Sequence, residues 1–255
     1  MRKPFVAANW KMHKTVAEAV DFASAFTPLV HTVTDVDIVV APSFLALPAL
    51  VESLAEHKIQ VAAQNVSAEP QGAFTGEISL GMLQASGVQL AIIGHSERRQ
   101  LFGETDGGVN AKTRATLDAG LTPIVCVGET LDEREAEHTF DVLNRQIDEG
   151  LSGLTPAQVT ELVVAYEPVW AIGTGKVATP DQADEAHRHL RGQLASTFGQ
   201  TAATACRIIY GGSVKPANAA ELMGRADVDG ALVGGASLDP TSFAEIVTAS
   251  RPGDR

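Results

Sequence analysis

One carboxylate in the chain stands in a setting that suits a catalytic base. Glu167 ends an apolar, β-branched run, 162–166, and Pro168 follows it directly. The run is typical of a buried strand, which the proline ends because it has no N–H to donate. The next residues, 169–176, are apolar at first and finish in Gly-Thr-Gly-Lys. Closure of such a loop would exclude water and raise the basicity of the carboxylate. The alternative is a strand-end glutamate in a structural ion pair.

Two other apolar runs end in groups that stabilise negative charge. Asn9 and Lys11 are two residues apart, which on extended backbone points both side chains to the same side. His95 precedes Ser96 and Glu97, which suit the first turn of a helix. The positive end of that helix favours a neutral imidazole. Together these groups could stabilise an oxyanion, although a solvated lysine and a structural histidine are the commoner fates of such residues.

The last two apolar runs end in glycine pairs, Gly211-Gly212 and Gly234-Gly235. Backbone N–H groups in such turns hold phosphate, especially where a short helix begins. Two pairs at consecutive strand ends therefore predict a phosphate site, to which the N–H groups of 173–176 could add. Tyr210 and Ser213 lie beside the first pair and suit a latch for a closed loop. Tight turns without a ligand are the alternative.

These groups need a scaffold that brings separate strand ends together. Strands that are apolar throughout and alternate with helices predict a parallel sheet covered on both faces. Eight such units in 255 residues favour a closed (β/α)8 barrel, whose chemistry lies at the C-terminal strand ends. No linker divides the chain, so we expect one domain over residues 1–255. The eight runs are Phe5–Asn9, Ile38–Ala41, Ile59–Gln64, Leu90–Gly94, Pro123–Val127, Leu162–Tyr166, Arg207–Tyr210 and Gly230–Val233.

Helix starts are visible between the runs. Thr15 suits an N-cap, Thr155 stands before a proline, and Thr179 begins a Thr-Pro-Asp-Gln capping box. Asp132 is expected to cap a long charged helix that runs to about Asp148.

Composition excludes several classes of protein. Nineteen basic against 31 acidic residues give a net charge of −12, which argues against a nucleic-acid partner. The longest uncharged apolar run, 38–51, is too short to span a bilayer and holds two prolines. Cys126 and Cys206 are far apart and are expected to be free thiols in a reducing compartment. We therefore expect a soluble, cytoplasmic protein with no membrane partner.

Taken together, the motifs resemble those of the triosephosphate isomerase family, in the same order and over nearly the whole chain. The resemblance implies interconversion of dihydroxyacetone phosphate and glyceraldehyde 3-phosphate in glycolysis and gluconeogenesis, with no metal and no cofactor. The matching segments are Asn9-Trp10-Lys11-Met12, Gly94-His95-Ser96-Glu97-Arg98-Arg99, 165–175, Tyr210-Gly211-Gly212-Ser213 and Val233-Gly234-Gly235-Ala236-Ser237.

The resemblance also implies residue roles. Glu167 would transfer the proton and His95 would donate to the carbonyl oxygen. Lys11 and Asn9 would hold the developing negative charge, and Glu97 would position Lys11. Ser96 would hold the glutamate while the lid is open. The phosphate would be bound by Gly173, Ser213, Gly234 and Gly235. The lid and its latch would comprise Pro168, Val169, Trp170, Lys176, Val177, Ala178 and Tyr210.

The polar run 65–79 resembles the family's interface loop, whose tip enters a second copy of the chain. The resemblance therefore implies a homodimer through this loop, with Thr75 near Glu97 of the partner subunit and Arg98 of the partner subunit. A solvated surface loop is the alternative.

Two other functions remain open at this stage. One is another phosphate-binding barrel enzyme, such as an aldolase or epimerase, although the middle strands lack the lysine of a Schiff-base aldolase. The other is a non-catalytic phosphate-ligand sensor or surface-binding protein on the same fold. A sensor needs no base, so the joint presence of Lys11, His95 and Glu167 favours an enzyme.

Overall fold

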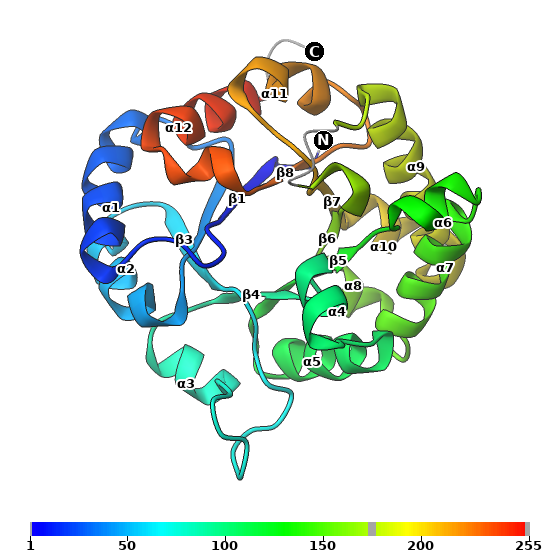
Figure 1. Cartoon of the computed structure of the whole chain (residues 1–255), viewed down its shortest axis with the longest axis horizontal. Coiled ribbons are helices and arrows are strands. Elements are labelled where there is room, and N and C mark those ends of the chain that lie inside the picture. The colour runs from blue at the N-terminus through cyan, green and yellow to red at the C-terminus, as the bar shows by residue number, and fades with distance from the viewer. Residues whose placement is uncertain (1, 173–176, 253–255) are drawn as a thin grey trace.

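Eight parallel strands close into a barrel at the centre of the molecule (Figure 1). The computed structural model describes residues 2–172 and 177–252. Each strand pairs with the next, and the last pairs with the first, which confirms the predicted barrel. The strands are β1 Phe5–Asn9, β2 Asp37–Ala41, β3 Ile59–Ala63, β4 Leu90–Ile93, β5 Thr122–Val127, β6 Val163–Tyr166, β7 Arg207–Tyr210 and β8 Gly230–Val233.

Helices surround the barrel and cover its outer face (Figure 1). They are α1 Val16–Val30, α2 Leu47–Leu54, α3 Leu80–Ala85, α4 Ser96–Phe102, α5 Asp106–Asp118, α6 Leu131–Glu135, α7 Thr139–Gly150, α8 Pro156–Thr160, α9 Pro180–Phe198, α10 Gln200–Ala205, α11 Pro216–Met223 and α12 Pro240–Ala249. Three single turns of 3-10 helix complete the set: η1 Phe44–Ala46, η2 Val169–Ala171 and η3 Gly235–Leu238.

The strands are apolar throughout because both of their faces are packed. In β1, Phe5 and Ala7 belong to the cluster inside the barrel, while Val6 and Ala8 belong to the larger cluster between strands and helices. Successive side chains of a strand point to opposite faces, so every position faces a core. Polar side chains therefore lie at or next to the strand ends.

Three of the predicted helix starts are confirmed. The side chains of Thr15, Thr155 and Thr179 cap α1, α8 and α9, and each forms a capping box with the residue three positions on. Proline occupies the first position of α8 and α9, where no N–H is needed.

The long helix predicted from Asp132 to about Asp148 is wrong. Thr130, not Asp132, caps α6, and its capping box with Glu133 starts a helix of five residues. Glu137 then has a φ of +62°, a left-handed conformation that a helix does not accommodate. The chain restarts as α7 two residues later.

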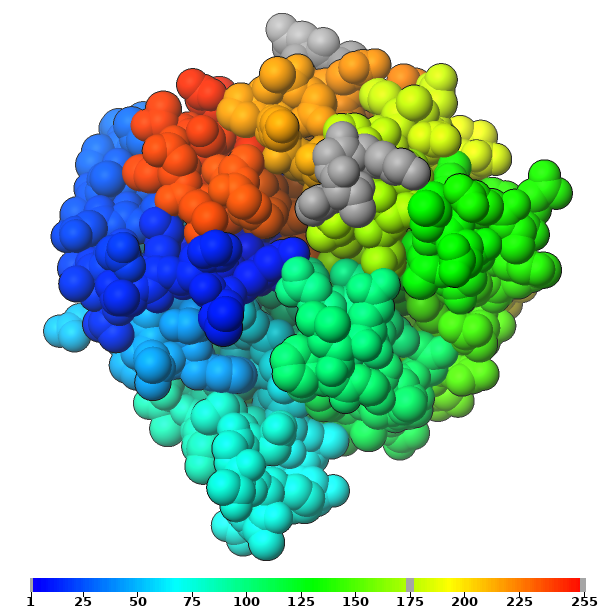
Figure 2. All heavy atoms as spheres, viewed as in Figure 1, coloured from blue at the N-terminus to red at the C-terminus, as the bar shows by residue number. Residues whose placement is uncertain are grey.

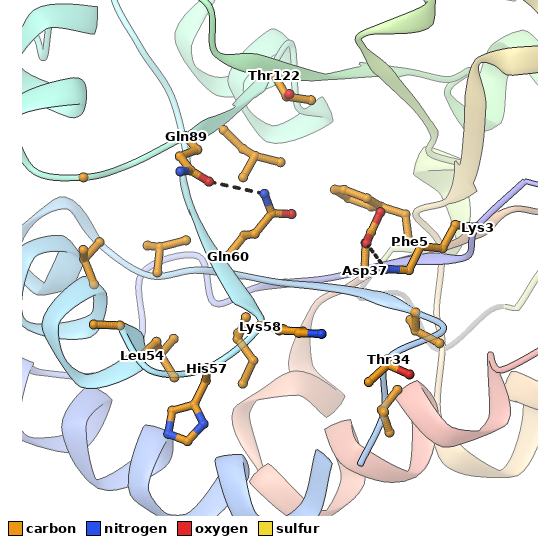
Figure 3. A pocket seen from close by; sticks show the side chains of 18 of the residues that line it. Lys3, Phe5, Thr34, Asp37, Leu54, His57, Lys58, Gln60, Gln89 and Thr122 are labelled. Carbon is orange, nitrogen blue, oxygen red and sulfur yellow. Dashed lines mark hydrogen bonds and ion pairs between the residues drawn. The ribbon is translucent and has the colours of Figure 1, made fainter. Parts of the chain in front are cut away.

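A cavity of about 580 Å³ lies at the N-terminal end of the barrel (Figure 3). The Asp37 carboxylate there pairs with Lys3 at 2.6 Å and with Arg207 at 2.5 Å. The amides of Gln60 and Gln89 bond to each other at 3.4 Å. Asp37 is thus neutralised by two cations and joins the starts of β1, β2 and β7, which is a structural role.

Candidate active site

A second cavity of about 580 Å³ opens at the C-terminal end of the barrel. In Figure 2 the segments after β1 (dark blue), β4 (green) and β8 (orange) surround the centre of this end. The cavity brings together side chains and glycines that follow five different strands. Its lining includes Asn9, Lys11, His95, Glu167, Ser213, Gly234 and Gly235.

Glu167 follows β6 directly and is almost fully buried, with 2 % of its surface exposed. One carboxylate oxygen lies 2.9 Å from Nε2 of His95, and the other accepts the backbone N–H of Ser96 at 2.8 Å. Burial alone would raise the pKa of Glu167, but His95 and the Ser96 N–H outweigh it and lower the pKa below its usual value. The group is therefore held as a carboxylate in this arrangement.

His95 caps the N-terminus of α4. Gly94 has a φ of +71° and turns the chain sharply after β4, as the sequence predicts. Nδ1 of His95 accepts the Glu97 N–H at 3.2 Å, so in that bond the ring proton is on Nε2, which faces Glu167.

The charge state of His95 depends on the position of Glu167. Burial lowers the pKa of His95, but the Glu167 carboxylate more than offsets this and raises it above its usual value. A second ring proton would have to go on Nδ1, where it would break the bond to the helix amide. The helix thus favours the predicted neutral imidazole, and the carboxylate opposes it.

Asn9 and Lys11 both line the cavity, but not for the predicted reason. Lys11 has a φ of +51°, so the backbone is not extended there, and its N–H bonds to Asn9 Oδ1 at 3.1 Å. Such a left-handed residue stores about 1–3 kcal/mol of strain. The side chain of Gln64 helps to hold it by donating to the Lys11 carbonyl at 2.9 Å. Nζ of Lys11 lies 2.5 Å from Glu97 Oε1.

The glycines after β7 are required by close packing. A Cβ on Gly211 would lie 2.8 Å from Cγ of Glu167, and one on Gly212 would lie 2.2 Å from the hydroxyl of Tyr210. The Gly211 N–H is already bonded to the Tyr166 carbonyl at 2.7 Å. Gly211 therefore makes room for the carboxylate. The second pair, Gly234-Gly235, leads into the short helix η3, as the sequence predicts.

The start of the expected lid rests on a buried carboxylate that sequence reasoning missed. Glu129 is fully buried and accepts bonds from Trp170 Nε1 at 2.8 Å, the Tyr166 hydroxyl at 3.1 Å and Arg134 at 3.0 Å. Its backbone carbonyl also accepts the Val169 N–H at 3.1 Å. The sequence does mark this residue: Gly-Glu follows the fifth apolar run, and polar residues also follow the other runs that contribute to the site.

The structure describes only some of the remaining lid and latch residues. Gly173 and Lys176 lie outside the described residues, while Val177 is half-exposed and Ala178 is buried. Pro168 precedes η2. The hydroxyl of Tyr210 is buried without a well-formed hydrogen bond within residues 2–172 and 177–252. Burial raises the pKa of Tyr210, an effect that the nearby Ala178 backbone opposes.

The 65–79 loop projects from the barrel between β3 and α3 (Figure 1). Thr75 is exposed on it. Arg98, on α4, pairs with Glu104 at 3.2 Å and lies over the Phe102 ring. The contacts predicted for Thr75, with Glu97 of the partner subunit and Arg98 of the partner subunit, would be made by a second copy of the chain and stay a prediction.

The described residues contain neither a cluster of metal-binding side chains nor a membrane-spanning helix. Within residues 2–172 and 177–252, no group of three or more His, Cys, Asp and Glu side chains is arranged to hold a metal ion. None of the described helices has the length and apolar character that crossing a membrane requires.

Comparison with known proteins gives one family. The sequence pattern of triosephosphate isomerase matches residues 4–250. The chain is 58 % identical over 250 residues to the triosephosphate isomerase of Citrifermentans bemidjiense, covering 98 % of this chain and all of the relative. It is 56 % identical over 247 residues to that of Solibacter usitatus, covering 97 % and 99 %. With a match from β1 to the end of α12, the chain belongs to the triosephosphate isomerase family.

Proposed function

We propose that the cavity at the C-terminal end of the barrel carries out the family's reaction with Glu167 as base and His95 and Lys11 as electrophilic partners. The reaction interconverts dihydroxyacetone phosphate and D-glyceraldehyde 3-phosphate, a step of glycolysis and gluconeogenesis. The observation that carries the proposal is the buried Glu167 carboxylate, which meets His95 at the wall of a cavity that also holds Lys11.

Proton transfer follows from the contacts of Glu167. Substrate binding gives the Nε2–H of His95 a carbonyl oxygen to donate to, and the carboxylate leaves His95 and Ser96. These are the contacts that lower its pKa, so their loss leaves burial, which raises it. Glu167 thereby becomes a stronger base as it reaches the carbon next to the carbonyl. It removes the proton and returns it to the neighbouring carbon through an enediolate.

The enediolate oxygens carry the negative charge that the other groups stabilise. His95 donates from Nε2, and Lys11 supplies a cation that Glu97 holds at 2.5 Å. Asn9 has committed its carbonyl oxygen to the Lys11 N–H, so its NH2 group is the donor that it offers. Nothing in this scheme calls for a metal or an organic cofactor, because the chain supplies both base and electrophile.

The phosphate is assigned to Ser213 and the Gly234-Gly235 turn, with Gly173 closing over it. Ser213, Gly234 and Gly235 line the cavity, and η3 begins at Gly235. The closed lid prevents loss of phosphate from the intermediate by keeping the phosphate in the plane of the enediolate, where its C–O bond is not aligned for elimination. Tyr210 and Ser213 serve as its latch.

Replacing the base tests the function. In Glu167→Gln the carboxylate is lost while the side-chain shape is kept, so turnover should fall by about 10²–10⁴-fold, or roughly 3–5 kcal/mol of barrier. Binding of inorganic phosphate should stay within a few-fold of wild type. A coupled assay of triose phosphate interconversion, run on both proteins, measures the first quantity, and calorimetry measures the second. Equal turnover in the two proteins would show that the base lies elsewhere. An inactive wild type that binds phosphate would favour the sensor.

We further propose that two copies associate through the 65–79 loop. Large apolar side chains are exposed along the segments from the end of β1 to α4, the part of the chain that contains this loop. Those side chains are Met12, Leu45, Phe74, Met82, Leu101 and Phe102. Exposed apolar surface of this extent is typical of an interface, and a partner loop that reaches Lys11 and His95 would support the site.

A cytoplasmic location is also proposed. Cys126 and Cys206 are both free and buried, which suits a reducing compartment.

A further inference from the structure

The backbone of the proposed base lies against a glycine from the neighbouring strand end. A Cβ on Gly128 would lie 1.7 Å from the Glu167 carbonyl oxygen and 2.6 Å from its carbonyl carbon. On either side of this contact, the Glu167 N–H bonds to the Val127 carbonyl at 2.7 Å and the Val169 N–H bonds to the Glu129 carbonyl at 3.1 Å. The segment 127–129 therefore fixes the stretch of backbone from which the Glu167 side chain extends.

The opposite edge of this segment is held by one side chain from α7. Oε1 of Gln146 accepts the Gly128 N–H at 2.7 Å, and its Nε2 donates to the Gly128 carbonyl at 3.1 Å. The amide of Gln146 thus satisfies both polar groups of one peptide residue, as a neighbouring strand would. Only glutamine and asparagine offer a donor and an acceptor in one neutral amide.

Gln146 is itself held rigidly and lies outside the substrate cavity. Its side chain is buried, with 4 % of the residue exposed, and α7 also buries Leu143 and Ile147 in the core. Gln146 does not line the cavity that holds His95 and Lys11, but it lines a neighbouring one of about 420 Å³ that reaches Glu167 from behind. Both side-chain hydrogen bonds of Gln146 go to Gly128, so Gly128 is the residue through which it contacts the backbone of Glu167.

We propose that Gln146 is a positioning residue for the base: its amide holds the Gly128 peptide in place beside the backbone of Glu167 and so sets the position from which the carboxylate extends. This inference rests on the proposed function, because it assumes that Glu167 transfers the proton. A displacement of about 1 Å at a reacting group can cost roughly 10²-fold in rate. Loss of the Gln146 bonds should therefore lower kcat more than it changes KM.

The first variant is Gln146→Leu, which keeps the apolar stem and removes both hydrogen bonds. We expect kcat to fall about tenfold or more, with KM within about threefold of wild type. Affinity for inorganic phosphate should not change, because Ser213 and Gly234 line the substrate cavity and Gly128 does not. The matched control is Ile147→Val, the next residue of α7, which loosens the same helix without touching Gly128.

The second variant, Gln146→Glu, should give a pH-dependent change in kcat, which a simple loss of stability does not. When protonated, the new carboxyl group donates to the Gly128 carbonyl and accepts its N–H, as the amide does. When ionised, it places a negative charge against that carbonyl. Burial raises the pKa of a carboxyl group, and the charged residues of the adjoining cavity are mostly acidic. They are Arg99, Glu104, Asp106, Glu133, Arg145, Glu149 and Glu167 itself.

The ratio of kcat in Gln146→Glu to kcat in wild type should therefore be near one at low pH and fall severalfold as the carboxyl ionises. Taking the ratio at each pH removes the pH dependence that the two proteins share. The measurement is the coupled assay between pH 5.5 and 9, with circular dichroism to confirm folding at each pH.

The outcomes separate this proposal from the proposed function. Absent turnover in wild type would refute the function itself. With an active wild type, kcat of Gln146→Leu within twofold of wild type overturns the positioning role. A fall in kcat that Ile147→Val reproduces at equal loss of thermal stability also overturns it. If Gln146→Leu does not fold, the Gln146→Glu ratio decides: a fall with pH supports the role, and a flat ratio overturns it.

Discussion

His95 and Glu167 set each other's charge, and the direction of each effect is visible in their contacts. Burial disfavours the charged form of both side chains. Their contact at 2.9 Å favours a cationic imidazole next to a carboxylate. The bond between Nδ1 and the Glu97 N–H favours the neutral ring. Whether His95 can act as a neutral donor thus depends on whether the carboxylate has moved away.

Removing the carboxylate charge should move the pKa of His95 downward through its usual value. In wild type the pKa lies above 6.5 because Glu167 outweighs burial. In Glu167→Gln, burial and the Lys11 charge, which both lower it, should win, so the pKa falls below 6.5. Nitrogen NMR of the imidazole during a pH titration measures this. The control, Glu97→Gln, removes a weaker effect from 3.8 Å and should lower the pKa less. If the pKa of His95 is the same in Glu167→Gln as in wild type, the Glu167 carboxylate is not what raises it.

At the scale of elements, α9 carries a buried histidine that links pH to stability. His187 is fully buried, its Nδ1 lies 3.1 Å from the Asp227 carbonyl, and its Nε2 has no hydrogen-bond partner among residues 2–172 and 177–252. Burial lowers its pKa to about 4. The rings of Tyr166 and Tyr210 lie beside it.

The depressed pKa of His187 predicts loss of stability in mild acid. Below the ordinary pKa of 6.5 the unfolded chain binds a proton that the folded chain does not, so the free energy of unfolding falls with pH until about pH 4. From pH 6.5 to 4.5 this amounts to roughly 2 kcal/mol. His187→Gln should lack that component. Denaturant unfolding of both proteins at one protein concentration measures it, and parallel pH profiles would refute the prediction.

Element types and order could be predicted from sequence because each strand is apolar on both faces. Three strands, β1, β7 and β8, have the predicted bounds, and the others differ by a residue at one end. The region after β5 was harder. Polar residues are frequent throughout 132–149, so composition alone indicated one helix. The break depends on the single left-handed residue Glu137, which no pattern marks.

Within the site, sequence indicated which residues gather but not how they are held. Asn9 and Lys11 meet through a left-handed turn rather than strand alternation. Gln146 looks like any polar residue of an amphipathic helix, and only the fold shows that it reaches Gly128. Such contacts join residues far apart in the chain, so the spacing of neighbouring residues does not predict them.

At the scale of the molecule, an acidic protein must attract an anionic substrate. The net charge of −12 repels phosphate esters at long range. Inside the cavity, Lys11 and the turn that starts η3 provide a local positive potential. Capture therefore depends on charges placed within a few ångströms of the ligand.

Association into dimers should be necessary for full turnover. Light scattering at micromolar concentration should give about twice the chain mass of 26.7 kDa. Thr75→Arg, which puts charge and bulk on the exposed loop, should weaken association and lower kcat roughly tenfold or more, because the partner's loop no longer supports Lys11 and His95. Ser152→Arg, at an exposed site between α7 and α8, is the control. A wild-type monomer with full activity would contradict this prediction.

Closure of the barrel also has a consequence for biosynthesis. β1 pairs with β8, which follows it by more than two hundred residues, and the two ends meet at the cavity through Asn9 and Gly234. At ribosomal speeds of about 5–20 residues per second, the first strand waits more than ten seconds for its second neighbour. During that time an apolar strand has an unpaired edge, the kind of surface on which nascent chains aggregate or recruit chaperones. Lys11, the cation of the proposed site, follows this strand directly after Trp10, so a nascent chain should acquire the proposed activity only after β8 has emerged and paired.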